Sequence, residues 1–346
     1  MKTIIGIMDS QLGGVNNFIA NYIKNNPQIE FVVLCNERIN DFYLQNLSNI
    51  VDVLQLPSVL HPLRLYKMLD SYLKANSIDS FYFNGSTMLH YPLLLAASKN
   101  NVKSIIFHSH SSYSAEENFI KRSVIILLHK IFRKLQSRLD ITRKACSDKA
   151  ASWMFEKNAD YKFIHNKVDY EKFKYNPAVR LQLQEEFQTK GKLVIGFIGS
   201  FCYQKKNKYF IKLAEKLKKK NVDFKIVMVG SGIQFDSFCC SVKKNHLEEY
   251  FILTGNRTDA NKFYNLFDVF VLPSRFEGLP FVGIEAQMNG LKCFFSKAIT
   301  RQVKITDGCE YFDLKNTKEL ADEISKIPLD RNYRISNLKN FNDFLL

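Results

Sequence analysis

The chain has 346 residues and a mass of 40.3 kDa, and 46% of its residues are hydrophobic and 24% charged. This length and composition fit a folded protein with two domains and exclude a disordered chain. The formal net charge of +15, from 49 basic and 34 acidic residues, indicates an anionic partner: a nucleic acid, a phospholipid surface or a phosphorylated substrate.

Several classes of protein are disfavoured by what the sequence lacks. No apolar stretch approaches the ~20 residues that span a bilayer, and the first residues run into an expected strand without a cleavage-site pattern. We therefore expect a cytoplasmic protein, or one peripheral on the inner face of the cell membrane.

The seven cysteines are odd in number and lack CxxC spacing, so we interpret them as reduced thiols and expect no metal site. Without zinc-finger spacing, an RNP-like signature or a basic arm, we expect no nucleic acid to bind.

The first half alternates strand-like apolar runs with segments of helical period. The expected strands are Thr3–Met8, Phe31–Leu34, Ser80–Phe83, Ser104–Phe107 and Thr142–Cys146. Leu63–Lys74 and Tyr91–Lys99 are expected helices between them. This alternation predicts a parallel sheet covered by helices.

Paired glycines, Gly13 and Gly14, follow the first expected strand. Glycines at the start of a helix let the backbone approach a ligand closely, and the helix N-terminus favours an anion. The alternative is that they only form the tight turn that any strand–helix unit can use.

Polar side chains at His108–Ser112 follow the fourth expected strand, with imidazoles at His108 and His110. Hydrogen-bonding groups at the carboxyl end of a parallel strand suit the hydroxyls of a sugar. A histidine in such a place can equally be a structural group whose hydrogen bonds are internal.

A basic amphipathic stretch runs from 121 to 149, with nine basic and two acidic residues. Its apolar residues recur at helical spacing, so one face of a helix is apolar and its flanks are cationic. Such a helix can dock on an anionic membrane. The alternative is a helix packed on its own domain with a solvated basic side. The apolar residues are Val124, Ile125, Leu127, Leu128, Ile131, Phe132 and Leu135.

The second half repeats the alternation. Its expected strands are Leu193–Ile198, Phe224–Val229, Phe251–Leu253, Val269–Leu272 and Cys293–Ser296, with a helix at Asn207–Lys219. The polar connector Lys172–Gly191 separates the halves. We predict an α/β protein with two tandem doubly wound Rossmann-like domains, 1–172 and 173–330, facing each other across a cleft. A helix over 331–346 is expected to pack back across them.

Two loops of the second half carry glycines and lysines. The turn at Gly199 and Ser200 leads to Lys205, which we expect to bind phosphate; a solvated helix start is the alternative. Gly230 lies in a second turn, Val229–Gly232, after the next strand.

The segment Ser274–Ala286 places Glu277 at the end of an apolar strand. Gly278, Leu279 and Pro280 are expected to turn the chain into a helix whose first N–H groups favour a diphosphate. Glu285, about two turns further on, can accept hydrogen bonds from sugar or ribose hydroxyls. The alternative is that Glu277 caps the helix and Glu285 is an exposed helical glutamate.

Taken in order, these motifs resemble the family-4 retaining glycosyltransferases of the GT-B fold, especially the branch of bacterial capsule and exopolysaccharide synthesis. The matches run from about residue 3 to residue 314. Phe107–Ser112 resembles the family's H-S-H-N-S loop, and Gly199–Asn207 its G-R-F-x-x-Q-K-N loop. Ser200 replaces the arginine of that loop, and a hydroxyl does not mimic a bidentate guanidinium.

The resemblance implies a role for each candidate residue. Gly13 and Gly14 face the donor diphosphate and the acceptor, and Gly230 lies near the nucleotide base. His110 hydrogen-bonds near the transferred sugar, with His108 in support. The remaining roles fall in the second half: Lys205 binds the phosphates together with Gly278, Leu279 and Pro280, Glu277 orients the donor hexose, and Glu285 holds the ribose. Where Ser200 departs from the family, Lys206, Lys208 or Arg275 are candidates for the missing charge.

By this resemblance the chain is a retaining hexosyltransferase that moves a sugar from a UDP-sugar donor to a lipid-linked saccharide acceptor. Neither a metal nor a cofactor is expected beyond the donor itself. Two other functions stay open. The same fold supports sugar-nucleotide epimerisation. Ser200 in place of arginine motivates a second alternative, a non-catalytic subunit that binds the sugar nucleotide for a partner transferase.

Overall fold

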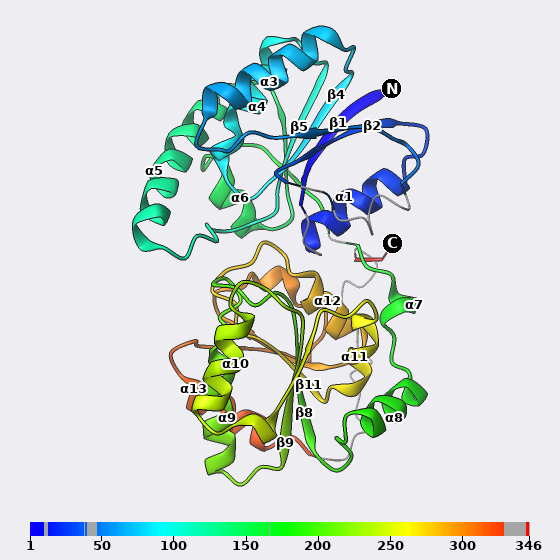
Figure 1. Ribbon diagram of the computed structural model, residues 1–346, viewed down its shortest axis with the longest axis vertical. Helices are drawn as coiled ribbons and strands as arrows, with labels where there is room; N and C mark the ends of the chain where they lie inside the picture. Colours follow the sequence, from blue (N-terminus) through cyan, green and yellow to red (C-terminus); the bar gives the residue numbers. More distant parts are fainter. Residues whose placement is uncertain (10–12, 38, 40–46, 166, 329–343, 346) are drawn as a thin grey trace. The chain divides into compact units, whose positions relative to one another are not determined.

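The computed structural model describes residues 1–9, 13–37, 39, 47–165, 167–328 and 344–345. The chain divides into two compact units, unit 1 (Met1–Asn166) and unit 2 (Lys167–Leu346). Each unit holds one parallel sheet flanked by helices (Figure 1). The division comes before Lys167, whereas the sequence places the boundary after Lys172.

Unit 1 contains a seven-stranded sheet in the order β3-β2-β1-β4-β5-β6-β7, with every neighbouring pair parallel. Its strands are β1 (Lys2–Met8), β2 (Glu30–Cys35), β3 (Ile50–Gln55), β4 (Ser80–Gly85), β5 (Ser104–Ser109), β6 (Thr142–Ala145) and β7 (Lys162–Phe163). Its helices are α1 (Gly14–Lys24), α3 (Pro62–Ala75), η1 (Met88–His90), α4 (Tyr91–Lys99), α5 (Phe119–Gln136) and α6 (Asp148–Met154).

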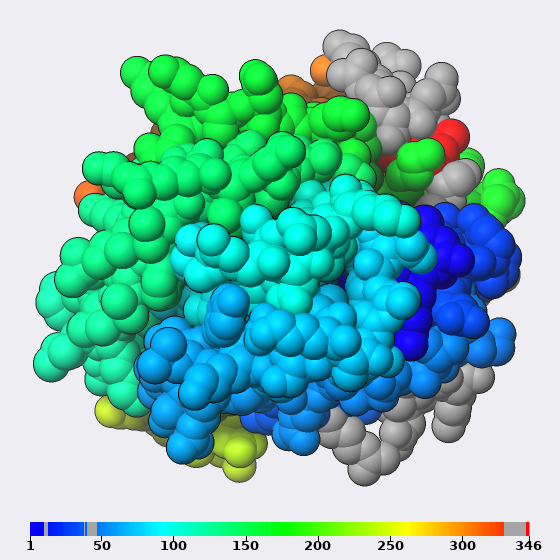
Figure 2. Space-filling view, turned by 90° about the horizontal axis from the view of Figure 1, so that it is seen from above, coloured from blue at the N-terminus to red at the C-terminus, as the bar shows by residue number. Residues whose placement is uncertain are grey.

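The order of the strands decides which face each helix covers. The chain leaves β1 through α1 toward one edge of the sheet and returns through α3 and α4 toward the other. Because parallel crossovers are right-handed, the two directions put the helices on opposite faces (Figure 1). The segments coloured blue to cyan, which contain α3 and α4, lie at the surface of the face shown in Figure 2.

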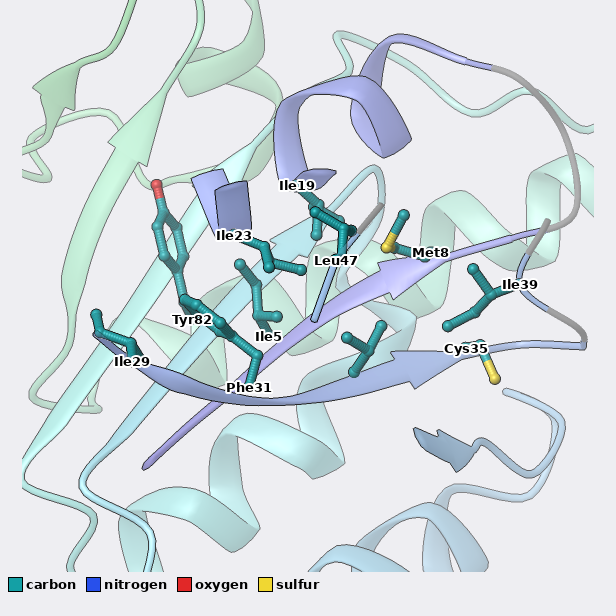
Figure 3. Packing of buried hydrophobic residues seen from close by; sticks show 11 residues of the cluster. Ile5, Met8, Ile19, Ile23, Ile29, Phe31, Cys35, Ile39, Leu47 and Tyr82 are labelled. Atoms are coloured by element: carbon teal, nitrogen blue, oxygen red, sulfur yellow. The ribbon is translucent and has the colours of Figure 1, made fainter. Parts of the chain in front are cut away.

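The core under α1 is built from alternate strand residues. Ile5, Phe31 and Tyr82 of the central strands pack in one cluster with Ile19 and Ile23 of α1 (Figure 3). Successive side chains of a strand point to opposite faces, so the intervening residues pack on the other face. This core holds the carboxyl ends of β1, β4 and β5 at one edge of the unit.

Unit 2 contains a six-stranded sheet in the order β10-β9-β8-β11-β12-β13, again with every neighbouring pair parallel. Its strands are β8 (Leu193–Ile198), β9 (Phe224–Val229), β10 (Phe251–Gly255), β11 (Val269–Leu272), β12 (Lys292–Ser296) and β13 (Cys309–Phe312). Its helices are α7 (Tyr170–Phe173), α8 (Pro177–Glu186), α9 (Tyr209–Lys219), α10 (Phe235–Lys244), η2 (Glu248–Tyr250), α11 (Ala260–Leu266), α12 (Phe281–Met288), η3 (Arg301–Val303) and α13 (Thr317–Ser325).

A buried ion pair ties α8 to the sheet of unit 2. The Arg180 guanidinium lies 2.6 Å from Asp268 Oδ1 and donates to the carbonyls of residues 265–267. The other oxygen of Asp268 accepts the N–H of Val194, at 2.7 Å. Each charge therefore has several partners, as burial requires.

Most of the predicted helix at 331–346 lies outside the described residues. Within them, the N–H of Val168 donates to the Phe344 carbonyl at 2.7 Å, and Val168 forms a parallel bridge with Leu345. The end of the chain is thus attached to the first segment of unit 2.

Candidate functional site

The site in unit 2 lies where the strand order reverses, between β8 and β11. Their pairing joins Ile195–Gly196 to Val269–Phe270, and each strand continues for two further residues. The loops that follow these strands therefore leave the sheet at the switch point, where doubly wound sheets bind ligands.

Lys205 and Glu277 come from these two loops and meet in a nearly buried ion pair. Lys205 Nζ lies 2.7 Å from Glu277 Oε1, and the two side chains are 15% and 7% exposed. Gln204 Nε2 donates to Glu277 Oε2 at 2.9 Å and to the Phe276 carbonyl at 3.1 Å. An ammonium has three N–H donors, so Lys205 can bond Glu277 and also a phosphate oxygen.

The turn after β11 leads into α12 as the sequence predicts. Glu277 stands between the strand and the turn Gly278–Leu279, and Pro280 is the N-cap residue of α12. The Pro280 carbonyl accepts the N–H groups of Gly283 and Ile284, at 3.1 and 3.4 Å. The N-terminal end of α12, with its partial positive charge, thus lies directly beside the turn.

Glu285 lies on α12 and is oriented by a residue of α11. The fully buried Tyr264 hydroxyl donates to Glu285 Oε2 at 2.6 Å. Burial raises the pKa of Glu285, while the hydrogen bond from Tyr264 and the charge of Lys172 oppose that rise. Tyr264 thus favours the ionised form of Glu285, which is the form that accepts hydroxyl hydrogen bonds.

The change Tyr264→Phe tests this orientation. Without the hydroxyl, the pKa of Glu285 is expected to rise further, so that binding of a sugar nucleotide weakens as the pH falls from 8 to 6. We expect about a tenfold larger Kd at the acidic end, measured by calorimetry at several pH values. Tyr250→Phe, in η2 with its ring stacked on Phe224, is the matched control. A parallel pH dependence in wild type and Tyr264→Phe would contradict the assignment.

Gly230 allows the turn Val229–Gly232 to lie in contact with the turn at Gly199 and Ser200. It has a φ of +131°, and a Cβ at this position would lie 2.3 Å from the Gly199 carbonyl oxygen. The Phe201 N–H donates to the Ser231 carbonyl at 2.9 Å. Ser200 thus lies in the first of two turns that are joined backbone to backbone, and only glycine fits at position 230.

Two of the three residues considered as replacements for the missing arginine, Arg275 and Lys206, have other contacts. Arg275 Nε donates to the Tyr203 carbonyl at 3.1 Å, and its guanidinium lies over the Tyr203 ring. Lys206 Nζ lies 3.4 Å from the Leu314 carbonyl. Lys208 is exposed at the start of α9.

The site residues of unit 1 gather at the carboxyl ends of β4 and β5. His110 Nε2 lies 2.8 Å from Asn84 Oδ1, and the rings of His108 and His110 are 4.0 Å apart. Phe18 of α1 contacts both rings, at 4.8 and 4.9 Å between centroids. Tyr82 bonds His108 Nδ1 from the other side, at 3.3 Å.

Asn84 determines the tautomer of His110. An amide oxygen only accepts, so His110 Nε2 carries the proton and Nδ1 is an acceptor. Burial lowers the pKa of His110 to about 3, and the imidazole is therefore neutral at physiological pH. A neutral ring with one bare nitrogen suits a sugar hydroxyl as donor.

Gly13 is the N-cap residue of α1, and Gly14 is its first residue. A Cβ on Gly13 would meet nothing within 4 Å, so packing within the unit does not demand glycine here. The first turn of α1 lies at the same edge of unit 1 as His110, because Phe18 contacts that ring.

The structure joins some candidates directly and leaves others in separate units. Lys205 contacts Glu277, and Ser200 and Gly230 belong to adjoining turns of unit 2, whereas His110 and the glycine pair belong to unit 1. Sequence reasoning missed the side chains that orient these groups, which are Gln204, Tyr264 and Asn84. Asn84 could have been found, since it too ends an apolar strand.

Two further properties concern the described part of the chain. No group of three or more His, Cys, Asp or Glu side chains there is arranged to hold a metal ion. Likewise, none of its helices combines the length and the apolar character needed to cross a membrane.

Comparison with protein families matches residues 180–340 to the glycosyl transferases group 1. EpsF of Bacillus subtilis, a protein named as a glycosyltransferase, is 30% identical over 219 residues, which cover 61% of this chain and 56% of EpsF. The UDP-Gal:alpha-D-GlcNAc-diphosphoundecaprenol alpha-1,3-galactosyltransferase of Escherichia coli is 33% identical over 139 residues, 38% of this chain and 35% of that enzyme. The matches thus span about half or less of these relatives.

Among solved structures, the crystal structure of Anabaena HepE in complex with UDP and glucose superposes with a TM-score of 0.78 at 17% identity. The superposition covers 96% of this chain and 91% of HepE. At this identity the likeness concerns the fold alone. It confirms the predicted GT-B fold, an α/β architecture of two Rossmann-like units.

Proposed function

We propose that this chain, which has the GT-B fold and matches the glycosyl transferases group 1 over residues 180–340, is a retaining hexosyltransferase that uses a UDP-sugar. The observation that carries the proposal is the Lys205–Glu277 ion pair beside the N-terminal end of α12, at the switch point of unit 2. A cation and a helix N-terminus suit a diphosphate, and a nearly buried carboxylate suits sugar hydroxyls.

In this reaction the C1–phosphate bond of the donor breaks while an acceptor hydroxyl bonds C1 from the same face, and the hydroxyl proton passes to the departing phosphate. Lys205 and the first N–H groups of α12 stabilise the charge on the diphosphate, which is the largest catalytic contribution expected of such a site. Glu277 orients the hexose, Glu285 holds the ribose, and neutral His110 accepts a hydrogen bond near the reacting carbon. The positive charge comes from the protein, so the proposed reaction needs neither a metal ion nor a cofactor.

For the acceptor we propose a saccharide linked to a lipid diphosphate, in the synthesis of a surface polysaccharide. The printed name of the Escherichia coli relative, a galactosyltransferase acting on a diphosphoundecaprenol-linked sugar, supports this choice. The likeness to EpsF supports exopolysaccharide synthesis.

A second candidate is a non-catalytic subunit that binds the sugar nucleotide. The observation in its favour is Ser200 in place of arginine, together with the contacts that Arg275 and Lys206 make elsewhere. If Ser200→Arg creates activity in an inactive wild-type protein, this candidate is correct. Epimerisation is distinguished by its product, since it yields a new UDP-sugar and no free UDP.

The proposal is tested by thermal unfolding with UDP-, GDP-, ADP- and dTDP-linked sugars in the presence of a chelator. At a concentration about a hundred times Kd, a ligand adds about 2.7 kcal/mol to the stability of the native state. We expect a shift of several degrees with one UDP-sugar, which Glu285→Ala abolishes and Glu248→Ala, an exposed residue of the same unit, retains. An unchanged melting temperature with every donor would refute the donor site.

A further inference from the structure

The helix α5 of unit 1 fully buries two polar side chains and exposes a run of apolar ones, while Leu128 and Phe132 are half-buried. Its fully buried residues are His129 and Gln136. Its exposed apolar side chains are Phe119 (72%), Ile120 (73%), Val124 (52%), Leu127 (60%) and Ile131 (47%). A surface helix of a globular domain ordinarily has the opposite arrangement.

The inward face is fixed by specific contacts, so the helix cannot turn to bury its apolar face. The His129 ring stacks on Trp153 at 3.9 Å. Its Nδ1 accepts the N–H of Met88 at 3.1 Å, and its Nε2 donates to the Trp153 carbonyl at 2.8 Å. Arg133 pairs with Glu156 at 3.0 Å, and Phe132 stacks on Tyr91. These contacts join α5 to η1, α4 and α6.

The outward apolar residues form one stripe. Ile120, Val124, Leu127 and Ile131 follow one another at intervals of four and three residues, which places them on one side of the helix. We call them, with Phe119, the α5 stripe. The helix lies at the surface of unit 1, in the teal-green region of the space-filling view (Figure 2).

Basic residues surround the α5 stripe. The helix carries Lys121, Arg122, Lys130, Arg133 and Lys134 and has no acidic residue. Exposed among them are Lys121, Lys130 and Lys134. Apolar side chains with lysines at their edge complement a surface that is apolar below and anionic above.

We propose that α5 is a membrane-docking helix whose apolar stripe inserts at the headgroup level of an anionic phospholipid bilayer. With 18 residues and five basic side chains the helix lies in the interface and does not cross it. A second copy of the chain fits this face less well, because pairing two α5 helices brings cations of both copies together without an acidic residue on either helix. The inference extends beyond the proposed reaction and rests on α5 alone.

The test is co-flotation of the full chain with vesicles of phosphatidylcholine and phosphatidylglycerol in equal parts, and with phosphatidylcholine alone. We expect binding to the anionic vesicles that weakens with salt. Leu127→Gln combined with Ile131→Gln should weaken it roughly a hundredfold, because two side chains leave the apolar phase. Lys130→Gln combined with Lys134→Gln should weaken it about twentyfold.

Matched controls come from the same unit. Leu60 and Leu63 are 76% and 75% exposed but lie before and at the start of α3, so Leu60→Gln with Leu63→Gln should leave binding unchanged. Lys67→Gln with Lys99→Gln, both exposed, controls for the loss of charge. Thermal unfolding of each variant verifies the fold.

Three results would overturn the proposal. The first is that the Leu127→Gln, Ile131→Gln variant binds anionic vesicles as strongly as the wild-type protein does. The second is that the wild-type protein binds neutral vesicles as strongly as anionic ones, without dependence on salt. The third is a dimer in analytical ultracentrifugation that this variant dissociates while anionic vesicles capture no protein, which would make the α5 stripe an interface between two copies. None of these results depends on a sugar nucleotide, so they are separate from the test of the proposed reaction.

Discussion

Lys205→Ala is expected to lower kcat/KM for release of UDP from the preferred UDP-sugar by about 10²–10³-fold. Lys205 is the cation at the switch point of unit 2, and it would meet the diphosphate both in the bound donor and as charge develops on the leaving group. The change also leaves the Glu277 carboxylate, 7% exposed, without its cation, and a nearly buried charge without its partner is destabilising.

The two effects of Lys205→Ala are separable. Loss of the phosphate contact lowers kcat, whereas the unpaired carboxylate of Glu277 lowers the stability of unit 2, which thermal unfolding measures. Lys216→Ala, an exposed lysine of α9 in the same unit, is the matched control and should change kcat/KM less than about threefold. A Lys205→Ala protein as active as the Lys216→Ala protein would remove Lys205 from the site.

The fold could be predicted well where strands are buried on both faces. Leu193–Ile198 and Val269–Leu272 are continuous apolar runs, and the structure has strands with the same bounds. Ile50–Gln55 was missed because Asp52 interrupts its apolar residues, so it lacks the continuous apolar run of the buried strands. It is an edge strand in which Val51 and Val53 are exposed. Cys309–Phe312 was also missed, as a four-residue edge strand that contains a glutamate.

The candidate site residues were chosen one by one from the sequence, which does not indicate the contacts between them. Lys205 and Glu277 were marked by their place after apolar strands, yet their ion pair depends on β8 and β11 being neighbours, which is a property of the strand order. Tyr264 lies in the middle of a short helix, and no local pattern distinguishes it from a core aromatic. Its role follows only from the hydrogen bond of its hydroxyl to Glu285 of α12.

The α5 helix shows the limit of periodicity most clearly. Its sequence predicts an amphipathic helix, but an apolar side at helical spacing indicates burial in a soluble domain and insertion in a membrane equally well. The inward contacts of His129 and Arg133, which decide between the two, join α5 to residues more than twenty positions away.

Unit 1 is expected to lose about 5 kcal/mol of stability when the pH falls from 7.5 to 5.5. Four of its histidines, His108 and His129 buried and His90 and His110 half-buried, have a pKa lowered by loss of solvent: about 4 for His90 and His129, about 3 for His110, and well below the ordinary value for His108. The unfolded chain takes up these protons near pH 6.5, while the folded unit stays neutral to lower pH. The unfolded state therefore binds more protons in this window, and stability falls with pH by about 1.4 kcal/mol per histidine at pH 5.5.

Carboxylates do not explain a loss in this range. The pKa values of Asp70 and Asp79 are lowered from 3.8, chiefly by hydrogen bonds, so their stabilising effect is lost only below about pH 4. The single tryptophan, Trp153, lies in unit 1 against His129, so its fluorescence in urea reports the unfolding of this unit. We expect the urea midpoint to fall by roughly 2 M between the two pH values.

A variant connects the expected loss to particular side chains. Among the described residues, His90 Nε2 is buried without a hydrogen-bond partner, and the ring contacts Phe83. His90→Phe thus removes a proton site and no hydrogen bond of that nitrogen, and it should reduce the pH-dependent loss by about a quarter while leaving the midpoint at pH 7.5 nearly unchanged. His61→Gln, at an exposed position before α3, should leave the pH dependence as it is. An equal urea midpoint at pH 5.5 and 7.5 in the wild-type protein would contradict the prediction, because it would mean that these histidines have the same pKa in the folded unit and in the unfolded chain. His110 would then be partly charged during the proposed reaction.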